Sequence, residues 1–136
     1  MELKDYGAES FVTDIGKATI QNDTFRTSLW TGKNLQVTLM SIEAGDDIGL
    51  EVHEGDQFLR IEKGQGFVQM GNSKENLNFE EKAENDYAIM IPAGKWHNVT
   101  NTGDDALKIY TIYAPPEHPH GTVHETRAIA MEAEEE

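Results

Sequence analysis

Cysteine is absent from the 136 residues, which excludes disulfides, a thiolate nucleophile and cysteine-based zinc sites. Basic residues are scarce, because 11 Lys and Arg stand against 25 Asp and Glu and give a formal net charge of −14. With no basic stripe to neutralise phosphates, nucleic acid and anionic membranes are not expected partners. Long apolar runs are also missing, so we expect no signal peptide, no membrane-spanning segment and a cytoplasmic location.

The chain has instead a succession of short apolar or alternating stretches separated by turns. The turns contain glycine, as in "EKGQG", "PAGK" and "NTGDD". Short strands at regular spacing with tight turns predict an all-β sandwich or barrel with mostly antiparallel pairing. The expected strands are 24–30, 35–42, 48–53, 57–62, 66–70, 77–81, 87–91, 96–101 and 107–113.

The length fits a single domain, which the composition divides into four parts. The first part should include a helical turn capped by Thr13 or Asp14. After Tyr113 the chain becomes rich in proline and histidine without a period, and it ends in the acidic run "MEAEEE". The parts are an N-terminal arm (1–22), the barrel (23–114), a C-terminal extended segment (115–130) and an acidic disordered tail (131–136).

Four polar side chains are expected to point into the barrel. Gln57 lies on the apolar face of its expected strand, and so does His97. Glu51 and His53 are two residues apart, so on a strand they point the same way. Burying unpaired polar groups costs about 1–3 kcal/mol each. A metal ion would satisfy all four side chains together, whereas the simpler alternative is a polar surface strand.

Two stretches with this pattern resemble the two motifs of the cupin family. The first motif is glycine, five residues, His-x-His, three or four residues, Glu, six residues and glycine. The second is glycine, five residues, Pro-x-Gly, two residues, His, three residues and Asn. The spacing of this sequence matches both motifs throughout. The residues at the motif positions are Gly45, Glu51, His53, Gln57 and Gly64, then Asp86, Pro92, Gly94, His97 and Asn101.

The resemblance implies a single-domain cupin β-barrel (a double-stranded β-helix, or jelly roll) with one divalent metal ion held by Glu51, His53, Gln57 and His97. The sequence is most similar to small bacterial cupins of the mannose-6-phosphate isomerase-like group. Glu51 stands where the family has its first His, and Gln57 where it has Glu, so the carboxylate has moved and the ligand charge is kept. This favours a working metal site over an empty polar pocket. Zn, Mn, Fe, Ni and Co all suit these ligands.

Three functions are compatible with such a site. The first is a metal-dependent, isomerase-like enzyme acting on a small hydroxy-carbonyl substrate such as a sugar or uronate. The second is a non-haem iron dioxygenase, because two His and one carboxylate form its ligand set. The third is a non-catalytic module that binds a small ligand, since one fold hosts many functions. We also expect a homodimer in which the N-terminal strand and the segment 113–124 form the interface.

Other charged residues are open to more than one reading. The tail histidines are expected to pack on the surface against prolines, with a second metal site or a proton-transferring role at the barrel mouth as alternatives. Glu54 and Asp56, in the turn-like "HEGDQ", are expected to be solvated. An anionic substrate could be held by a basic side chain, and the pattern singles out none of them. The tail histidines are His118, His120 and His124, and the basic candidates are Arg26, Arg60 and Lys95.

Overall fold

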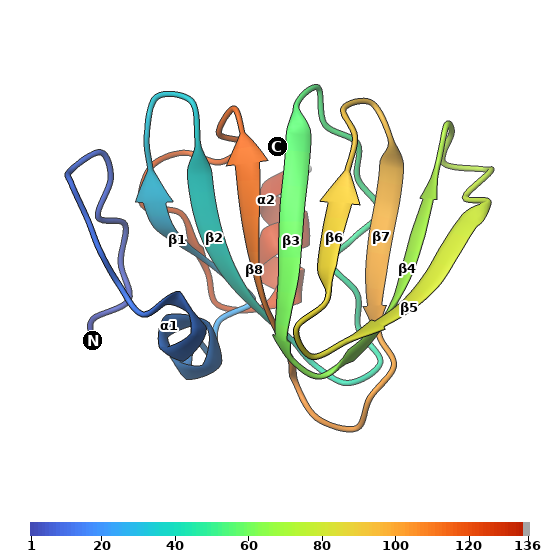
Figure 1. The fold of residues 1–136 in the computed structure, drawn as a ribbon, viewed down its shortest axis with the longest axis horizontal. Coiled ribbons are helices and arrows are strands. Elements are labelled where there is room, and N and C mark those ends of the chain that lie inside the picture. Colours follow the sequence, from blue (N-terminus) through green and yellow to red (C-terminus); the bar gives the residue numbers. More distant parts are fainter. Residues whose placement is uncertain (135–136) are drawn as a thin grey trace.

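The computed structural model describes residues 1–134 and shows a β-barrel with two helices (Figure 1). The first half contains α1 (Ile15–Gln21), β1 (Arg26–Thr31), β2 (Gln36–Ile42), β3 (Asp56–Lys63) and β4 (Gln65–Gly71). The second half contains β5 (Phe79–Glu84), β6 (Ala88–Ile91), β7 (Trp96–Asn101), β8 (Leu107–Ala114), β9 (Val123–His124) and α2 (Arg127–Glu134). Among these residues, no helix is long and apolar enough to cross a membrane.

The strands form two antiparallel sheets. The larger sheet has the order β6-β3-β8-β2-β1-β9 and the smaller has the order β5-β4-β7. Within residues 1–134 every pair of neighbouring strands is antiparallel, which confirms the expected all-β class. In Figure 1 the larger sheet occupies the left and middle of the view, the smaller sheet lies at the right, and α2 lies behind the middle strands.

The inward-facing side chains divide the barrel interior into an apolar and a polar part. In one row Met40, Ile109 and Ile61 are neighbours across β2, β8 and β3, and all three are buried. Farther along the same strands the inward positions are polar, since Thr38 pairs with Thr111. Apolar side chains from both sheets thus form the core, while one set of inward-facing buried polar residues lies toward one end. The polar set comprises Arg26, Ser28, Gln36, Thr38, Gln57, His97 and Thr111.

The expected strand at 48–53 is wrong as a regular strand. This segment makes a single isolated bridge, which joins Glu51 to His97 on β7. Gly49 has a φ of 94°, a left-handed conformation that interrupts an extended strand and that glycine adopts without steric cost. The backbone of Glu51 nevertheless exchanges two hydrogen bonds with His97, at 3.0 and 2.9 Å. The segment is therefore fixed to β7 just where the candidate ligands lie.

The C-terminal region is only partly as expected. Residues 115–124 do run extended over the domain, where Gln36 accepts from the backbone of Glu117 and His118 and β9 pairs with β1. Residues 127–134 were expected to lie in the extended segment and the disordered tail. This expectation is wrong, because they form helix α2. Ala130 is fully buried in the barrel core, and Met131 packs against that core. This burial stabilises a sequence of good helix formers. Positions 135–136 of the expected tail lie outside the described residues.

The N-terminal arm lies along the outside of the larger sheet. Its helix α1 is capped by Asp14, whose Oδ1 accepts from Lys17 N at 3.1 Å, as expected for one of the two cap candidates. Tyr6 and Phe11 stack with their ring centroids 4.4 Å apart and pack against the buried Leu29. The arm is therefore an integral part of the fold.

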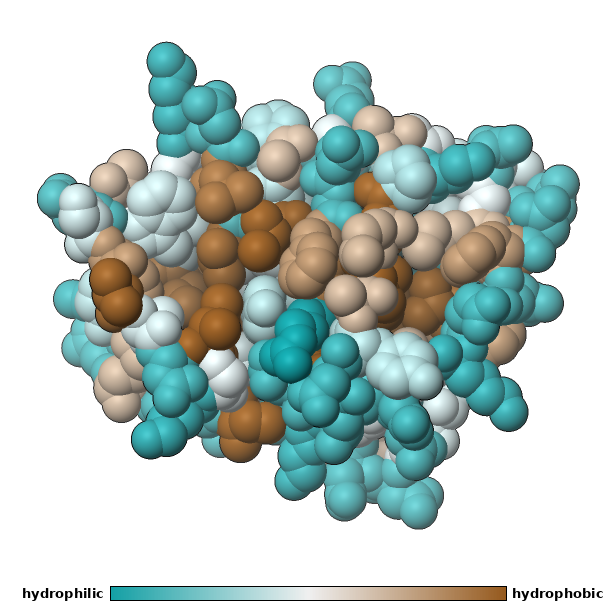
Figure 2. Space-filling model, in the orientation of Figure 1, coloured by the Kyte–Doolittle hydropathy of each residue, from teal (hydrophilic) through white to brown (hydrophobic). Residues whose placement is uncertain are grey.

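The outer face of the larger sheet carries a band of apolar side chains. Figure 2 shows it in brown and tan across the middle of the molecule, with hydrophilic residues in teal above and below. Phe58, Met90 and Ile112 border one shallow depression on this face, and Met90 is 66% exposed. The expected homodimer stays a prediction.

Asp5 links the N-terminal arm to β1 and to the C-terminal segment. Its carboxylate accepts from Thr31 N at 2.9 Å, from Thr31 Oγ1 at 2.5 Å and from Gly7 N at 2.9 Å. It also accepts from Gly121 N at 3.0 Å, and its side chain is 1% exposed. Burial alone would raise the pKa of Asp5, but the hydrogen bonds from Thr31, Gly121 and Gly7 hold that pKa below its usual value.

We predict that Asp5→Ala lowers the free energy of unfolding by about 2–4 kcal/mol, because four donors, two of them on Thr31, lose a charged acceptor. The contribution of Asp5 is fully present above the unfolded-state pKa of about 3.9 and is lost as the pH falls through the lower folded-state value. Urea unfolding of wild type and variant between pH 7 and pH 2 measures this. A difference in stability that stayed constant over the whole range would contradict the assignment.

A second prediction concerns the attachment of α2. Arg127 Nη2 lies 2.7 Å from Asp47 Oδ1, and its Nε donates to Asp47 O at 3.1 Å. We expect Asp47→Ala and Arg127→Ala each to lower the free energy of unfolding by about 1 kcal/mol, with a coupling of about 0.5–1 kcal/mol in the double variant. Hydrogen exchange should accelerate in α2 in both variants. Additive effects would mean that the pair does not anchor the helix.

Candidate metal centre

Glu51, His53 and His97 converge at the polar end of the barrel. Each offers one ligand atom, and the three atoms all lie within 4.8 Å of one another. His97 projects from β7, while Glu51 and His53 come from the segment that is hydrogen-bonded to β7. His97 is 1% exposed. Three of the four expected ligands are thus brought together, in a donor set that could hold a divalent ion.

Several buried polar atoms at this end have no hydrogen-bond partner within residues 1–134. They include Glu51 Oε1, Gln57 Oε1 and His97 Nε2. The amide of Gln57 donates through Nε2 to Thr111 Oγ1 at 2.8 Å, so its free end is the carbonyl oxygen. All three unpartnered atoms carry lone pairs, and a cation satisfies such a set where another donor is missing. The residues therefore fit a bound metal ion, while Gln57 as its fourth ligand stays a prediction.

His97 is held with one nitrogen available. Its Nδ1 lies 3.0 Å from the carbonyl oxygen of Lys95, so Nδ1 carries the proton and Nε2 keeps its lone pair. Burial lowers the pKa of His97, and the nearby His53 adds to this effect. A neutral imidazole fixed by a backbone acceptor is the usual form of a metal-binding histidine.

Glu51 and His53 form an ion pair in the structure. His53 Nε2 lies 2.9 Å from Glu51 Oε2, and His53 Nδ1 lies 3.4 Å from Glu117 Oε2. Burial would raise the pKa of Glu51, but His53 and Arg26 lower it overall. Burial would lower the pKa of His53, but the hydrogen bond with Glu51 and the charges of Glu51 and Glu117 raise it. Glu117 is therefore placed to orient the His53 ring from the side opposite Glu51.

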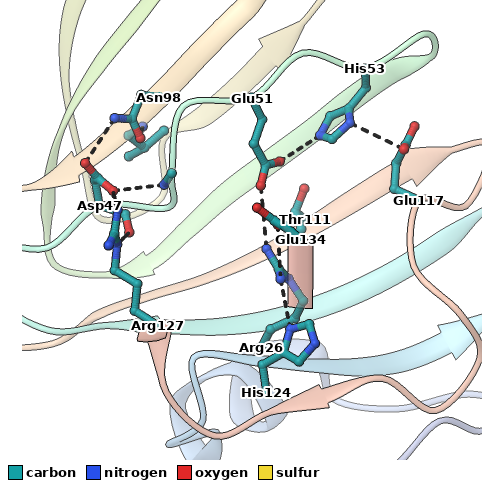
Figure 3. A network of polar contacts seen from close by, with 12 residues as sticks. Arg26, Asp47, Glu51, His53, Asn98, Thr111, Glu117, His124, Arg127 and Glu134 are labelled. Atoms are coloured by element: carbon teal, nitrogen blue, oxygen red, sulfur yellow. Dashed lines mark hydrogen bonds and ion pairs between the residues drawn. The ribbon is translucent and has the colours of Figure 1, made fainter. Parts of the chain in front are cut away.

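Arg26 extends this polar network toward the C-terminal helix, as Figure 3 shows. It is fully buried on β1. Its Nη1 lies 3.0 Å from His124 Nδ1 and 3.7 Å from Glu134 Oε1, and its Nη2 lies 3.8 Å from Glu51 Oε1. Burial and the neighbouring Glu51 raise the pKa of Glu134, whereas burial and Arg26 lower the pKa of His124.

The tail histidines separate in the structure. His120 is exposed and bonds to Gly7 O at 2.7 Å, in line with surface packing. His118 and His124 lie on the site side, since the ring of His118 is 5.4 Å from that of Tyr113 and 6.5 Å from that of His124. Burial lowers the pKa of His118 to about 4. Within the described part of the chain they form no second metal-holding group.

The remaining candidates lie elsewhere. Glu54 and Asp56 are exposed, as expected, and Asp56 accepts from the backbone of Ala93. Arg60 pairs with Glu62 and Asp86, and Lys95 is hydrogen-bonded to Asn72. These contacts leave Arg26 as the basic residue at the site.

Glu117 and Glu134 were missed by the sequence analysis. Glu117 lies among prolines and histidines whose path the pattern does not define, and Glu134 lies in an acidic run typical of a solvated tail. Arg26 was one of three basic candidates for holding an anionic substrate, and the sequence pattern did not distinguish Arg26 from the other two. Its strand begins with four buried residues in succession, so no alternation marked the inward position.

Comparisons with known proteins agree with this geometry. Residues 38–113 match the family described as "Cupin domain". The chain is 63% identical over 134 residues to the uncharacterized protein YrkC of Bacillus subtilis (strain 168), covering 98% of this chain and 72% of that protein. It is 36% identical over 115 residues to the uncharacterized protein L612 of Acanthamoeba polyphaga mimivirus, covering 83% of this chain and 70% of that protein.

A solved structure is also similar over nearly the whole chain. The crystal structure of BH2720 from Bacillus halodurans superposes with a TM-score of 0.94 at 62% identity, covering 95% of this chain and 98% of that one. The two sheets, the inward polar residues and the match over residues 38–113 support one assignment. The chain belongs to the cupin family.

Proposed function

We propose that this cupin binds one divalent metal ion through Glu51, His53, His97 and Gln57, and that it is a metal-dependent, isomerase-like enzyme. The proposed substrate is a small hydroxy-carbonyl compound such as a sugar or uronate. The observation that carries the metal site is the group of unpartnered lone-pair atoms, Glu51 Oε1, Gln57 Oε1 and His97 Nε2, found within residues 1–134. The resemblance to the mannose-6-phosphate isomerase-like group supports the reaction class.

The chain supplies the surroundings that such chemistry needs. A divalent ion at these ligands would act as a Lewis acid toward a carbonyl oxygen. Lys95 O fixes the His97 ring, Glu117 orients His53, and Thr111 holds the Gln57 amide. These contacts position the ligands before any substrate arrives, which limits the reorganisation needed during a reaction.

Two side chains beside the site offer hydrogen-bonding groups to a substrate. His118 offers an Nε2 atom that is buried and has no partner among the described residues, and its low pKa keeps the ring neutral near pH 7. Burial raises the pKa of Tyr113, so its hydroxyl keeps its proton. The Tyr113 ring lies 5.5 Å from that of His53. The neutral His118 ring is thus suited to accept a hydrogen bond at Nε2, and the Tyr113 hydroxyl to donate one.

We predict that the purified chain carries about one divalent metal ion after loading with Zn, Mn, Fe, Ni or Co. Glu51→Ala and His97→Ala should each weaken binding by at least about 100-fold, because each removes a direct ligand. Elemental analysis after dialysis measures this. Glu54→Ala is the matched control, since Glu54 is an exposed carboxylate near Glu51 and its loss should leave the metal content unchanged. Stoichiometric metal in both ligand variants would contradict the site.

Non-haem iron dioxygenase chemistry remains a second candidate, because two imidazoles and one carboxylate are the side chains brought together. The two candidates differ in their need for oxygen. We expect the loaded protein to interconvert members of a sugar and uronate panel under argon, as followed by NMR, with no oxygen uptake at an electrode. The His97→Ala variant should be inactive. Oxygen consumption with the iron-loaded form alone would instead favour the dioxygenase.

A further inference from the structure

Arg26 is a buried cation whose own contacts do not satisfy it. Its side chain is 1% exposed, and a guanidinium stays charged inside proteins and offers five donor hydrogens. Within residues 1–134 it makes one hydrogen bond, with His124 Nδ1 at 3.0 Å. Its Nε has no partner within the described residues. Because a buried charge is costly unless it is paired and hydrogen-bonded, this position needs an anion.

The carboxylate of Glu51 does not meet that need. Its Oε1 lies 3.8 Å from Arg26 Nη2, beyond hydrogen-bond distance, and its Oε2 is engaged with His53 at 2.9 Å. His124 is a neutral partner, since it accepts from the guanidinium at Nδ1. The planar fork of Arg26, which matches a carboxylate in two-point contact, therefore remains open.

The nearest additional anion is Glu134 at the end of α2. Its Oε1 lies 3.7 Å from Arg26 Nη1, and its side chain is 39% exposed. The helix is attached through Arg127 near its start and through the buried Ala130, whereas Glu134 is on its last turn. In Figure 3 the Glu134 carboxylate lies between Glu51 and Arg26. Glu134 thus lies against the proposed metal ligand Glu51, while its distance from the Arg26 guanidinium is beyond hydrogen-bond length.

We propose that Arg26 binds the carboxylate of a small carboxylic acid, and that Glu134 occupies this position until the ligand replaces it. The inference rests on the proposed function for the neighbouring metal site, and it narrows the substrate class to compounds that bear a carboxylate. An incoming carboxylate would take the place of the Glu134 carboxyl group beside Arg26. A ligand that reached within hydrogen-bond distance would also satisfy the guanidinium better than Glu134 does.

Acetate and acetamide test the proposal, because they have nearly the same shape and differ in charge. The probe is the NMR signal of the Arg26 Nε–H group, assigned by its loss in Arg26→Lys. We expect acetate to shift this signal saturably with a dissociation constant in the millimolar range usual for so small a ligand, and acetamide to have no effect. No shift with acetate up to about 100 mM, in wild type and in Glu134→Gln, would overturn the proposal.

Glu134→Gln tests the role of α2. Removing a carboxylate held at high effective concentration should tighten acetate binding about tenfold. Glu132→Gln is the matched control, because Glu132 is an exposed carboxylate on the same helix, and its affinity for acetate should equal that of wild type. Hydrogen exchange in residues 127–134 should rise with acetate in wild type. Equal affinities of Glu134→Gln and Glu132→Gln for acetate would overturn the proposal that Glu134 occupies the acetate position.

The metal content of the same samples is measured separately by elemental analysis. Arg26→Lys keeps the charge but loses the fork, so it should bind metal normally and acetate at least about tenfold more weakly. Metal at full stoichiometry with no acetate response would end the present inference and leave the proposed function standing. An acetate response in protein that never takes up metal would support the carboxylate site and reject the metal-dependent function.

Discussion

Polar side chains that face the interior of a barrel must find partners there, and the arrangement of one end of this molecule follows from that requirement. The apolar end needs only close packing of residues such as Ile61 and Ile109. At the polar end each group restricts the next, because Thr111 holds Gln57 and Lys95 O holds His97. The lone pairs left over define where a cation fits, and the donors left over on Arg26 define where an anion fits.

The barrel strands alone do not complete this polar end. The segment 115–124 brings Glu117 against His53 and His124 against Arg26, and α2 adds Glu134. The N-terminal arm fixes that segment in turn, through Asp5 and Gly121. Parts of the chain outside the matched family region thus shape the site, which is how members of one fold come to differ in chemistry.

Local patterns were enough to predict most of the fold. Alternation and turn residues located the barrel strands, since inward and outward positions there differ in polarity. The segment around Gly49 was misjudged because a left-handed glycine breaks the strand, yet the motif spacing still identified Glu51, His53 and His97. Helix α2 was missed because its stability comes from the burial of Ala130 in a distant core, and no local pattern records such a contact.

The site joins residues that are far apart along the chain. Arg26 and His124 are separated by 98 positions, and Asp5 and Gly121 by 116. Closing such long loops costs entropy before any contact is gained, so folds dominated by distant pairings form slowly. The site therefore requires long loops to be closed before its contacts can form. A chain that is still emerging from the ribosome has neither Glu117 nor His124 at the barrel, and Arg26 cannot be buried with its partner until His124 has been made.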